Sequence, residues 1–195
     1  MRQWRIAALQ STWEKHVEPA CVEKNLEWTV QKIRELKQYS VEVVCLAEIF
    51  ATCNLAEQPA RSAQDREGNI VQTMLATAKE LQMAILCPLY EKRDHRIYNT
   101  VIVIDKTGQI VESYDKIHPT EDEMDRGIVP GKTEPTVIEL EGVKIGCQIC
   151  FDANWPGDWL ALKHAGARMI FFCSAFSAGT LLQGYATILG LPILA

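Results

Sequence analysis

The sequence predicts a mixed β-sheet in a layered α/β domain. Strand-like and helix-like segments alternate through its first half, and two hairpin-like pairs of strands follow. With 195 residues, the chain is long enough for one domain with a real core and too short for two comfortable ones. We therefore expect residues 1–195 to form a single domain.

Elements of the first half are read from the spacing of their apolar residues. Continuous apolar runs are typical of strands buried on both faces, and apolar residues three and four apart are typical of helices. The expected strands are 5–9, 41–47 and 83–89. The expected helices are 19–38, with Pro19 suited to the first turn, and 70–81.

Hairpins are expected in the second half. The paired strands are 98–105 with 109–114, and 136–140 with 143–149. Gly108 lies in the first turn and Glu141-Gly142 forms the second, as tight turns require. A charged loop at 116–135 separates the two hairpins, and a helix at 156–165 and a strand at 169–173 follow them.

Residues 169–195 include no charged side chain, which is one property of a membrane span. Seven polar, glycine or proline positions interrupt this stretch: Ser174, Ser177, Gly179, Thr180, Gln183, Gly184 and Pro192. We therefore favour a strand, a polar turn, a helix at 180–189 and the start of a strand at 192–195. Because the chain stops inside that apolar run, we expect the fold to be incomplete at its C-terminus.

Composition excludes several classes of partner. The chain is 48% apolar and 23% charged, with a formal net charge of -5 and no basic stripe, so nucleic acid and anionic membrane surfaces are not expected partners. Its seven cysteines are odd in number, several lie in apolar runs, and the start lacks a signal-peptide pattern. These features predict a protein of the reducing cytoplasm.

Three ionisable residues follow predicted strands, at the sheet edge where sites assemble in open α/β folds: Glu48, Lys116 and Cys150. Each alone has an ordinary explanation, as a helix cap, a solvated cation or a packed thiol. Together they form a working set, because a thiolate is a nucleophile and a carboxylate can take its proton. An ammonium nearby is expected to lower the thiol pKa below its free value of about 8.5.

Sequence blocks around these residues resemble the signature blocks of the nitrilase superfamily. They are LAEIF at 46–50, YDKIHPT at 114–120 and GCQICFDANWP at 146–156, with YNTVIVID at 98–105, VPG at 129–131 and FFCSAFS at 171–177. The resemblance extends from Trp4 to Ala195. It implies an α-β-β-α sandwich, no metal or other cofactor, and homo-oligomers that pair through helices flanking the sheets.

The resemblance also implies roles for individual residues. Cys150 would attack an amide carbonyl, Glu48 would act as general base, and Lys116 with the backbone N–H of Phe151 would form an oxyanion hole. A second glutamate would support the lysine, with Glu123 the first choice and Glu121 the alternative. Phe and Asp at 151–152 resemble the amidase and carbamoylase branches, so the expected substrate is a small amide or N-carbamoyl compound.

Two departures from the family pattern bear on activity. Gly157 stands where members usually have glutamate, and members commonly continue for a further third of their length. A noncatalytic protein of the same fold is therefore an alternative. A second alternative is a redox or zinc site at Cys147 and Cys150, but residues three apart on a strand point to opposite faces. His118 either lines the mouth of the site or only packs against its neighbours.

Overall fold

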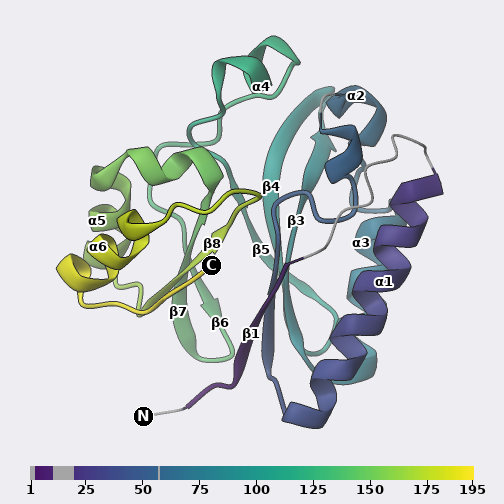
Figure 1. Cartoon of the computed structure of the whole chain (residues 1–195), viewed down its shortest axis with the longest axis horizontal. Helices are drawn as coiled ribbons and strands as arrows, with labels where there is room; N and C mark the ends of the chain where they lie inside the picture. The colour runs from purple at the N-terminus through teal and green to yellow at the C-terminus, as the bar shows by residue number, and fades with distance from the viewer. Residues whose placement is uncertain (1–2, 11–19, 57) are drawn as a thin grey trace.

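Two β-sheets lie face to face in the computed structural model, which describes residues 3–10, 20–56 and 58–195 (Figure 1). Helices α1 (Ala20–Leu36) and α3 (Asn69–Leu81) cover the outer face of the first sheet, and α5 (Pro156–His164) and α6 (Thr180–Leu189) cover that of the second. This is the α-β-β-α sandwich that the sequence resemblance implies, and the expectation is confirmed.

Strands of the first sheet lie in chain order. They are β1 (Ile6–Leu9), β2 (Val43–Leu46), β3 (Ala84–Arg93), β4 (Arg96–Ile104) and β5 (Ile110–Asp115). The first three are parallel and the last two are added as antiparallel hairpins, so β2 and β5 run in the same direction. The carboxyl ends of β2 and β5 therefore share one edge of the sheet.

The second sheet has four strands in the order β6-β7-β8-β9. They are β6 (Val137–Leu140), β7 (Val143–Ile149), β8 (Met169–Cys173) and β9 (Ile193–Leu194). The β6–β7 turn places Glu141 at φ 49° and Gly142 at φ 79°, both in the left-handed region that a tight hairpin of this kind requires. The predicted Glu141-Gly142 hairpin is confirmed.

Apolar side chains fill three layers. Ile33 and Met74 lie between the first sheet and its helices, and Trp159 packs against Phe172 and Tyr185 beneath α5 and α6. Between the sheets lies a core that includes Val43, Cys45, Leu86, Val101, Cys147, Phe171 and Cys173. Each fully buried large apolar side chain contributes about 1.5–3 kcal/mol, so the middle layer holds the two sheets together.

Short helical segments complete the described chain. They are the 3₁₀ turns η1 (Lys37–Tyr39), η2 (Cys53–Leu55) and η3 (Cys150–Asn154), and the α-helices α2 (Pro59–Ser62) and α4 (Glu121–Asp125). The helix α4 corrects the prediction of a plain loop at 116–135. Thr120 and Glu123 form a reciprocal capping box there, which stabilises a helical turn within the charged segment.

The long β3–β4 hairpin extends beyond the predicted strands, which stopped at residue 89 and began at 98. Its turn is made by Asp94 and His95, both with positive φ and neither a glycine, so the usual glycine signal is missing. In the tail, α6 begins and ends where predicted. No helix in the described ranges is long and apolar enough to cross a membrane. Pro19 lies outside the described residues.

Candidate active site

Lys116 lies between two carboxylates at the shared edge of β2 and β5. Its Nζ is 3.1 Å from Glu48 Oε1 and 2.7 Å from Glu123 Oε2. All three side chains are buried, with relative exposures of 2% for Lys116, 5% for Glu48 and 8% for Glu123. Ion pairs shielded from water in this way hold a fixed geometry much better than surface pairs do.

Asn99 links the same two carboxylates. Its Nδ2 donates to Glu48 Oε1 at 2.8 Å and to Glu123 Oε1 at 2.9 Å, and its side chain is buried. Its backbone oxygen accepts from the Lys116 N–H at 2.8 Å, so β4 positions the lysine as well. Sequence reasoning did not assign Asn99 a role, although the block at 98–105 drew attention to it.

The Glu48 side chain is fixed from both sheets. The chain leaves β2 in a turn in which Ile49 takes φ 44°, and this turn brings the glutamate to the sheet edge. The backbone N–H of Ala175, just beyond β8, donates to Glu48 Oε2 at 3.2 Å. The FFCSAFS block thus contributes a backbone donor to the site.

Gly131 supports the backbone at Lys116. The Gly131 N–H donates to the Lys116 carbonyl at 2.8 Å, and a Cβ at position 131 would lie 2.4 Å from the Asp115 carbonyl oxygen. Only glycine allows such a close approach of two backbone segments. The Val-Pro-Gly segment therefore packs directly against the strand end that presents the lysine.

Glu123, not Glu121, contacts the lysine. Helix α4 turns Glu123 inward, where its Oε2 also accepts from the Thr120 N–H at 2.8 Å, whereas Glu121 is exposed. The two alternatives left open by the sequence are therefore separated by the capping geometry of α4.

Cys150 occupies a sharp bend between β7 and η3. Its backbone takes φ 44°, an unfavourable conformation for a residue with a side chain, and strained positions of this kind cluster at functional sites. Its thiol lies close enough to Glu48 and Lys116 for both charges to act on it. The following residue, Phe151, is exposed. The structure thus brings together Glu48, Lys116, Glu123 and Cys150, which the sequence spreads over a hundred positions.

Electrostatics at the thiol differ from the sequence expectation. Burial, then the charge of Glu48, raise the pKa of the Cys150 thiol to about 12, and Lys116 only partly opposes them. The prediction of a lowered thiol pKa is therefore wrong. Its physical reason is first the burial of the thiol, which disfavours the thiolate, and then the charge of Glu48, which Lys116 offsets only in part.

The ion pairs also shift the partners of the thiol. Burial opposes the charged form of Lys116, but Glu48 and Glu123 outweigh it and raise the lysine pKa above its ordinary value. For Glu123, burial is again opposed and outweighed by Lys116, and the carboxyl pKa falls. Lys116 and Glu123 therefore remain charged at neutral pH.

A hollow of about 360 Å³ has a lining that includes Ile117, His118, Phe151 and Trp155 but none of the four residues of the cluster. His118 stacks on Trp155 with ring centroids 3.8 Å apart, and its Nε2 lies 2.7 Å from Asp158 Oδ2. His118 therefore both lines the hollow and packs against its neighbours.

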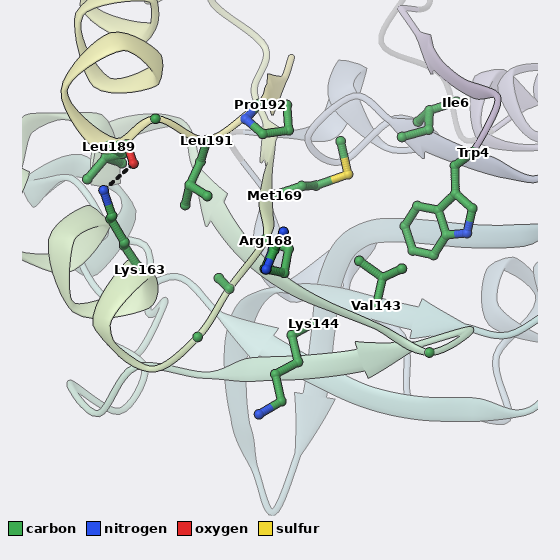
Figure 2. A pocket seen from close by; sticks show the side chains of 14 residues that line it. Trp4, Ile6, Val143, Lys144, Lys163, Arg168, Met169, Leu189, Leu191 and Pro192 are labelled. Carbon is green, nitrogen blue, oxygen red and sulfur yellow. Dashed lines mark hydrogen bonds between the residues drawn. The ribbon is translucent and has the colours of Figure 1, made fainter. Parts of the chain in front are cut away.

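A larger hollow, of about 1070 Å³, lies elsewhere, as Figure 2 shows. It opens between the start of β1, the β6–β7 turn and the segments that precede β8 and β9, and Lys163 donates to the Leu189 carbonyl at its side. Its apolar lining includes Trp4, Ile6, Val143, Met169, Leu191 and Pro192. These segments are at the opposite ends of the strands from Cys150, so this hollow is not the candidate active site.

Cys147 does not share the environment of Cys150. Its side chain is fully buried in the core between the sheets, where burial raises its pKa, whereas Cys150 is partly exposed. Neither forms a disulfide. The geometry thus separates the two thiols, as expected from their spacing on a strand.

Comparison with known families shows where the chain belongs. Residues 5–189 match the family described as carbon-nitrogen hydrolase. The chain belongs to this family. Similar sequences are found among carbon–nitrogen hydrolases of the nitrilase superfamily. The deaminated glutathione amidase of Bos taurus is 25% identical to this chain over 173 residues, which are 81% of this chain and 53% of that protein.

A second sequence relative and a solved amidase structure are also similar to this chain. The 2-oxoglutaramate amidase of Bacillus subtilis (strain 168) is 28% identical over 177 residues, which cover 87% of this chain and 64% of that protein. The crystal structure of an amidase from Nesterenkonia sp. superposes with a TM-score of 0.85 at 21% identity, over 97% of this chain and 74% of that one. The chain thus spans about half to two-thirds of these two sequence relatives.

Proposed function

We propose that this protein hydrolyses the carbon–nitrogen bond of a small amide or N-carbamoyl compound through a thioester on Cys150. The observation that carries the proposal is the buried ion pair between Lys116 and Glu48, 3.1 Å apart, because the charges of both residues act on the Cys150 thiol. Nucleophile, base and cation thus form one connected group in a buried site.

In the first half of the reaction, Cys150 Sγ bonds to the carbonyl carbon as its proton passes to Glu48. The carbonyl oxygen becomes an oxyanion, stabilised by the Lys116 ammonium and the backbone N–H of Phe151. The carbon–nitrogen bond then breaks, and the proton on Glu48 passes to the departing ammonia or amine. Because the resting thiol pKa is about 12, proton transfer accompanies attack instead of preceding it.

In the second half, Glu48 takes a proton from water, which attacks the thioester carbon. The carbon–sulfur bond breaks, the sulfur regains a proton, and the acid product leaves. Glu123 and Asn99 do not contact the reacting atoms in this scheme. They keep Lys116 and Glu48 in place through the bonds described above.

Substrate class is supported by two features. Phe and Asp at 151–152 resemble the amidase and carbamoylase branches, and two relatives are named as amidases. A nitrile is therefore not the proposed substrate.

The test is to trap the thioester by mass spectrometry across a panel of small amides and N-carbamoyl compounds. An adduct on Cys150, lost in Cys150→Ala and retained in the matched variant Cys147→Ala, is the expected result. A correctly folded protein that forms no adduct with any compound would instead support the noncatalytic alternative. Turnover that persists in Cys150→Ala would overturn the assignment of the nucleophile.

We also propose that the 195 residues act as one domain and pair through α5 and α6. Apolar side chains on the outer faces of these helices support the pairing, with Leu160 44%, Leu181 40% and Ile188 77% exposed. Sedimentation of the wild type should show a dimer that Ile188→Glu dissociates. A wild type that sediments as a monomer at high concentration would contradict the pairing.

A further inference from the structure

A buried carboxylate that the proposed reaction does not use lies between Lys116 and Cys150. Asp152 is fully buried and accepts three hydrogen bonds. Its Oδ1 accepts from the His118 N–H at 2.9 Å, and its Oδ2 accepts from the Ile149 N–H at 2.9 Å and from Tyr114 Oη at 2.8 Å. All donors are neutral, so the carboxylate serves geometry and not charge pairing.

The positions of these donors give the carboxylate its significance. Tyr114 and His118 lie two residues before and two residues after Lys116, and Ile149 immediately precedes Cys150. Tyr114 belongs to the first sheet and Ile149 to the second. One carboxylate therefore joins the strand end that presents the lysine to the strand end that presents the thiol.

The main chain of Asp152 is anchored too. Trp159, fully buried on α5, donates from its indole N–H to the Asp152 carbonyl at 3.3 Å. Asp152 thus cannot shift without moving the helix behind it, which makes it a rigid reference point for both strand ends.

Burial without a cation partner is costly for a carboxylate, and burial is the main reason that the pKa of Asp152 lies above its ordinary value. Three hydrogen bonds offset only part of that cost. The contacts of Asp152 converge on the backbone beside Lys116 and Cys150, which indicates that its burial serves the site that contains these two residues.

We propose that Asp152 is a positioning residue that fixes the distance between the Lys116 ammonium and the Cys150 sulfur. The proposal rests on the proposed function, in which these two groups act on the same carbonyl. Because a misplacement of about 1 Å costs on the order of 100-fold in rate, the loss of this link should lower kcat and leave KM nearly unchanged.

The test compares Asp152→Asn with Asp105→Asn. Asp105 is the matched control, since its carboxylate also accepts three hydrogen bonds, two from Thr107 and one from Gln109, but in the distant β4–β5 turn. An amide can satisfy only part of the donor set at 152 and turns an N–H toward another N–H. We expect kcat to fall about 100-fold at similar KM in Asp152→Asn, and to stay unchanged in Asp105→Asn.

A second measurement needs no substrate. Iodoacetamide alkylation of Cys150 at pH 9 reports how well Lys116 stabilises the thiolate. Asp152→Asn should react about tenfold more slowly, which corresponds to one unit of thiol pKa, and Asp105→Asn at the wild-type rate. A wild type without amidase activity would count against the proposed function, while this measurement would still test the positioning role.

Three results would overturn the proposal: kcat of Asp152→Asn within threefold of wild type, an unchanged alkylation rate, or losses that only follow the fraction of unfolded protein at the assay temperature. If Asp152→Asn does not fold, Asp152→Glu restores the carboxylate one methylene out of place and should show the kcat loss. Tyr114→Phe removes one of the three bonds and should lose less than either.

Discussion

Asn99 donates from a single amide nitrogen to both Glu48 and Glu123, at 2.8 and 2.9 Å. Two like-charged carboxylates are thereby held on either side of the Lys116 ammonium. The positions of Glu48, Glu123 and Lys116 therefore depend on a neutral side chain as well as on their own charges. The predictions below change residues of this group or the backbone that holds it.

Asn99→Leu should lower both stability and turnover. The change keeps the side-chain volume and removes two buried donors, and each unsatisfied buried acceptor costs about 1–3 kcal/mol. Thermal unfolding measures the first effect and kcat the second. The control is Gln72→Leu on the outer helix α3, which removes an amide that donates to the Arg66 carbonyl. Equal kcat in the two variants would contradict a role for Asn99 in the site.

Lys116→Met should abolish turnover and also destabilise the fold. Removal of the cation leaves two carboxylates buried without a partner, and breaking a buried ion pair in this way costs about 3–5 kcal/mol. Chemical denaturation and turnover are the measurements. A variant as stable as the wild type would show that the two carboxylates find other donors.

Glu48→Gln should make the Cys150 thiol react faster with an alkylating reagent while it abolishes amide turnover. The charge of Glu48 and its hydrogen bond both raise the pKa of the thiol, so their removal lowers that pKa and speeds alkylation by iodoacetamide at pH 8. The same variant loses its base and should show no amide turnover. In the wild type, the alkylation rate should keep rising with pH above 10. A plateau below pH 9 would contradict the raised pKa.

Glu123 should make stability depend on pH in the acid range. Its folded-state pKa is depressed, so its contribution to stability is complete above the unfolded value of about 4.3 and is lost as pH falls through the folded value. The free energy of unfolding of wild type and Glu123→Gln should therefore differ most at pH 6 and converge below pH 4. A difference that stays constant over this range would rule out the linkage.

Gly131→Ala should disturb Lys116 without touching its side chain. The added Cβ would lie 2.4 Å from the Asp115 carbonyl oxygen, so one backbone segment must move. We expect a loss of stability of about 1–3 kcal/mol, as for other overpacked sites, together with lower kcat. Gly157→Ala is the control, because no atom lies within 4 Å of a Cβ there. That variant should be as stable as the wild type or slightly more stable.

Sequence reasoning located the main candidates for catalytic residues because the ends of strands can be recognised in the sequence. Glu48, Lys116 and Cys150 each come at the end of a predicted strand, and parallel strands bring such positions to one edge. Asn99 was not found because it lies inside a strand, where its role follows from the pairing of β3, β4 and β5. Pairing between distant segments has no local signature in a single sequence.

Other features were missed for different reasons. The capping box of α4 had a readable signature, Thr120 followed three residues later by Glu123, and it could have identified the second glutamate. The raised thiol pKa could not have been read in the same way. It depends first on how deeply the sulfur is buried and then on the charges of Glu48 and Lys116 beside it, and both are known only from the folded structure.

The left-handed backbone at Cys150 strains a residue that the proposed chemistry requires to carry a side chain. Glycine would adopt this bend without strain, so Cys150→Gly should give a protein that withstands heat better than Cys150→Ala, although neither retains a sulfur. Any screen for thermal resistance alone would therefore favour a residue at this position that cannot be acylated.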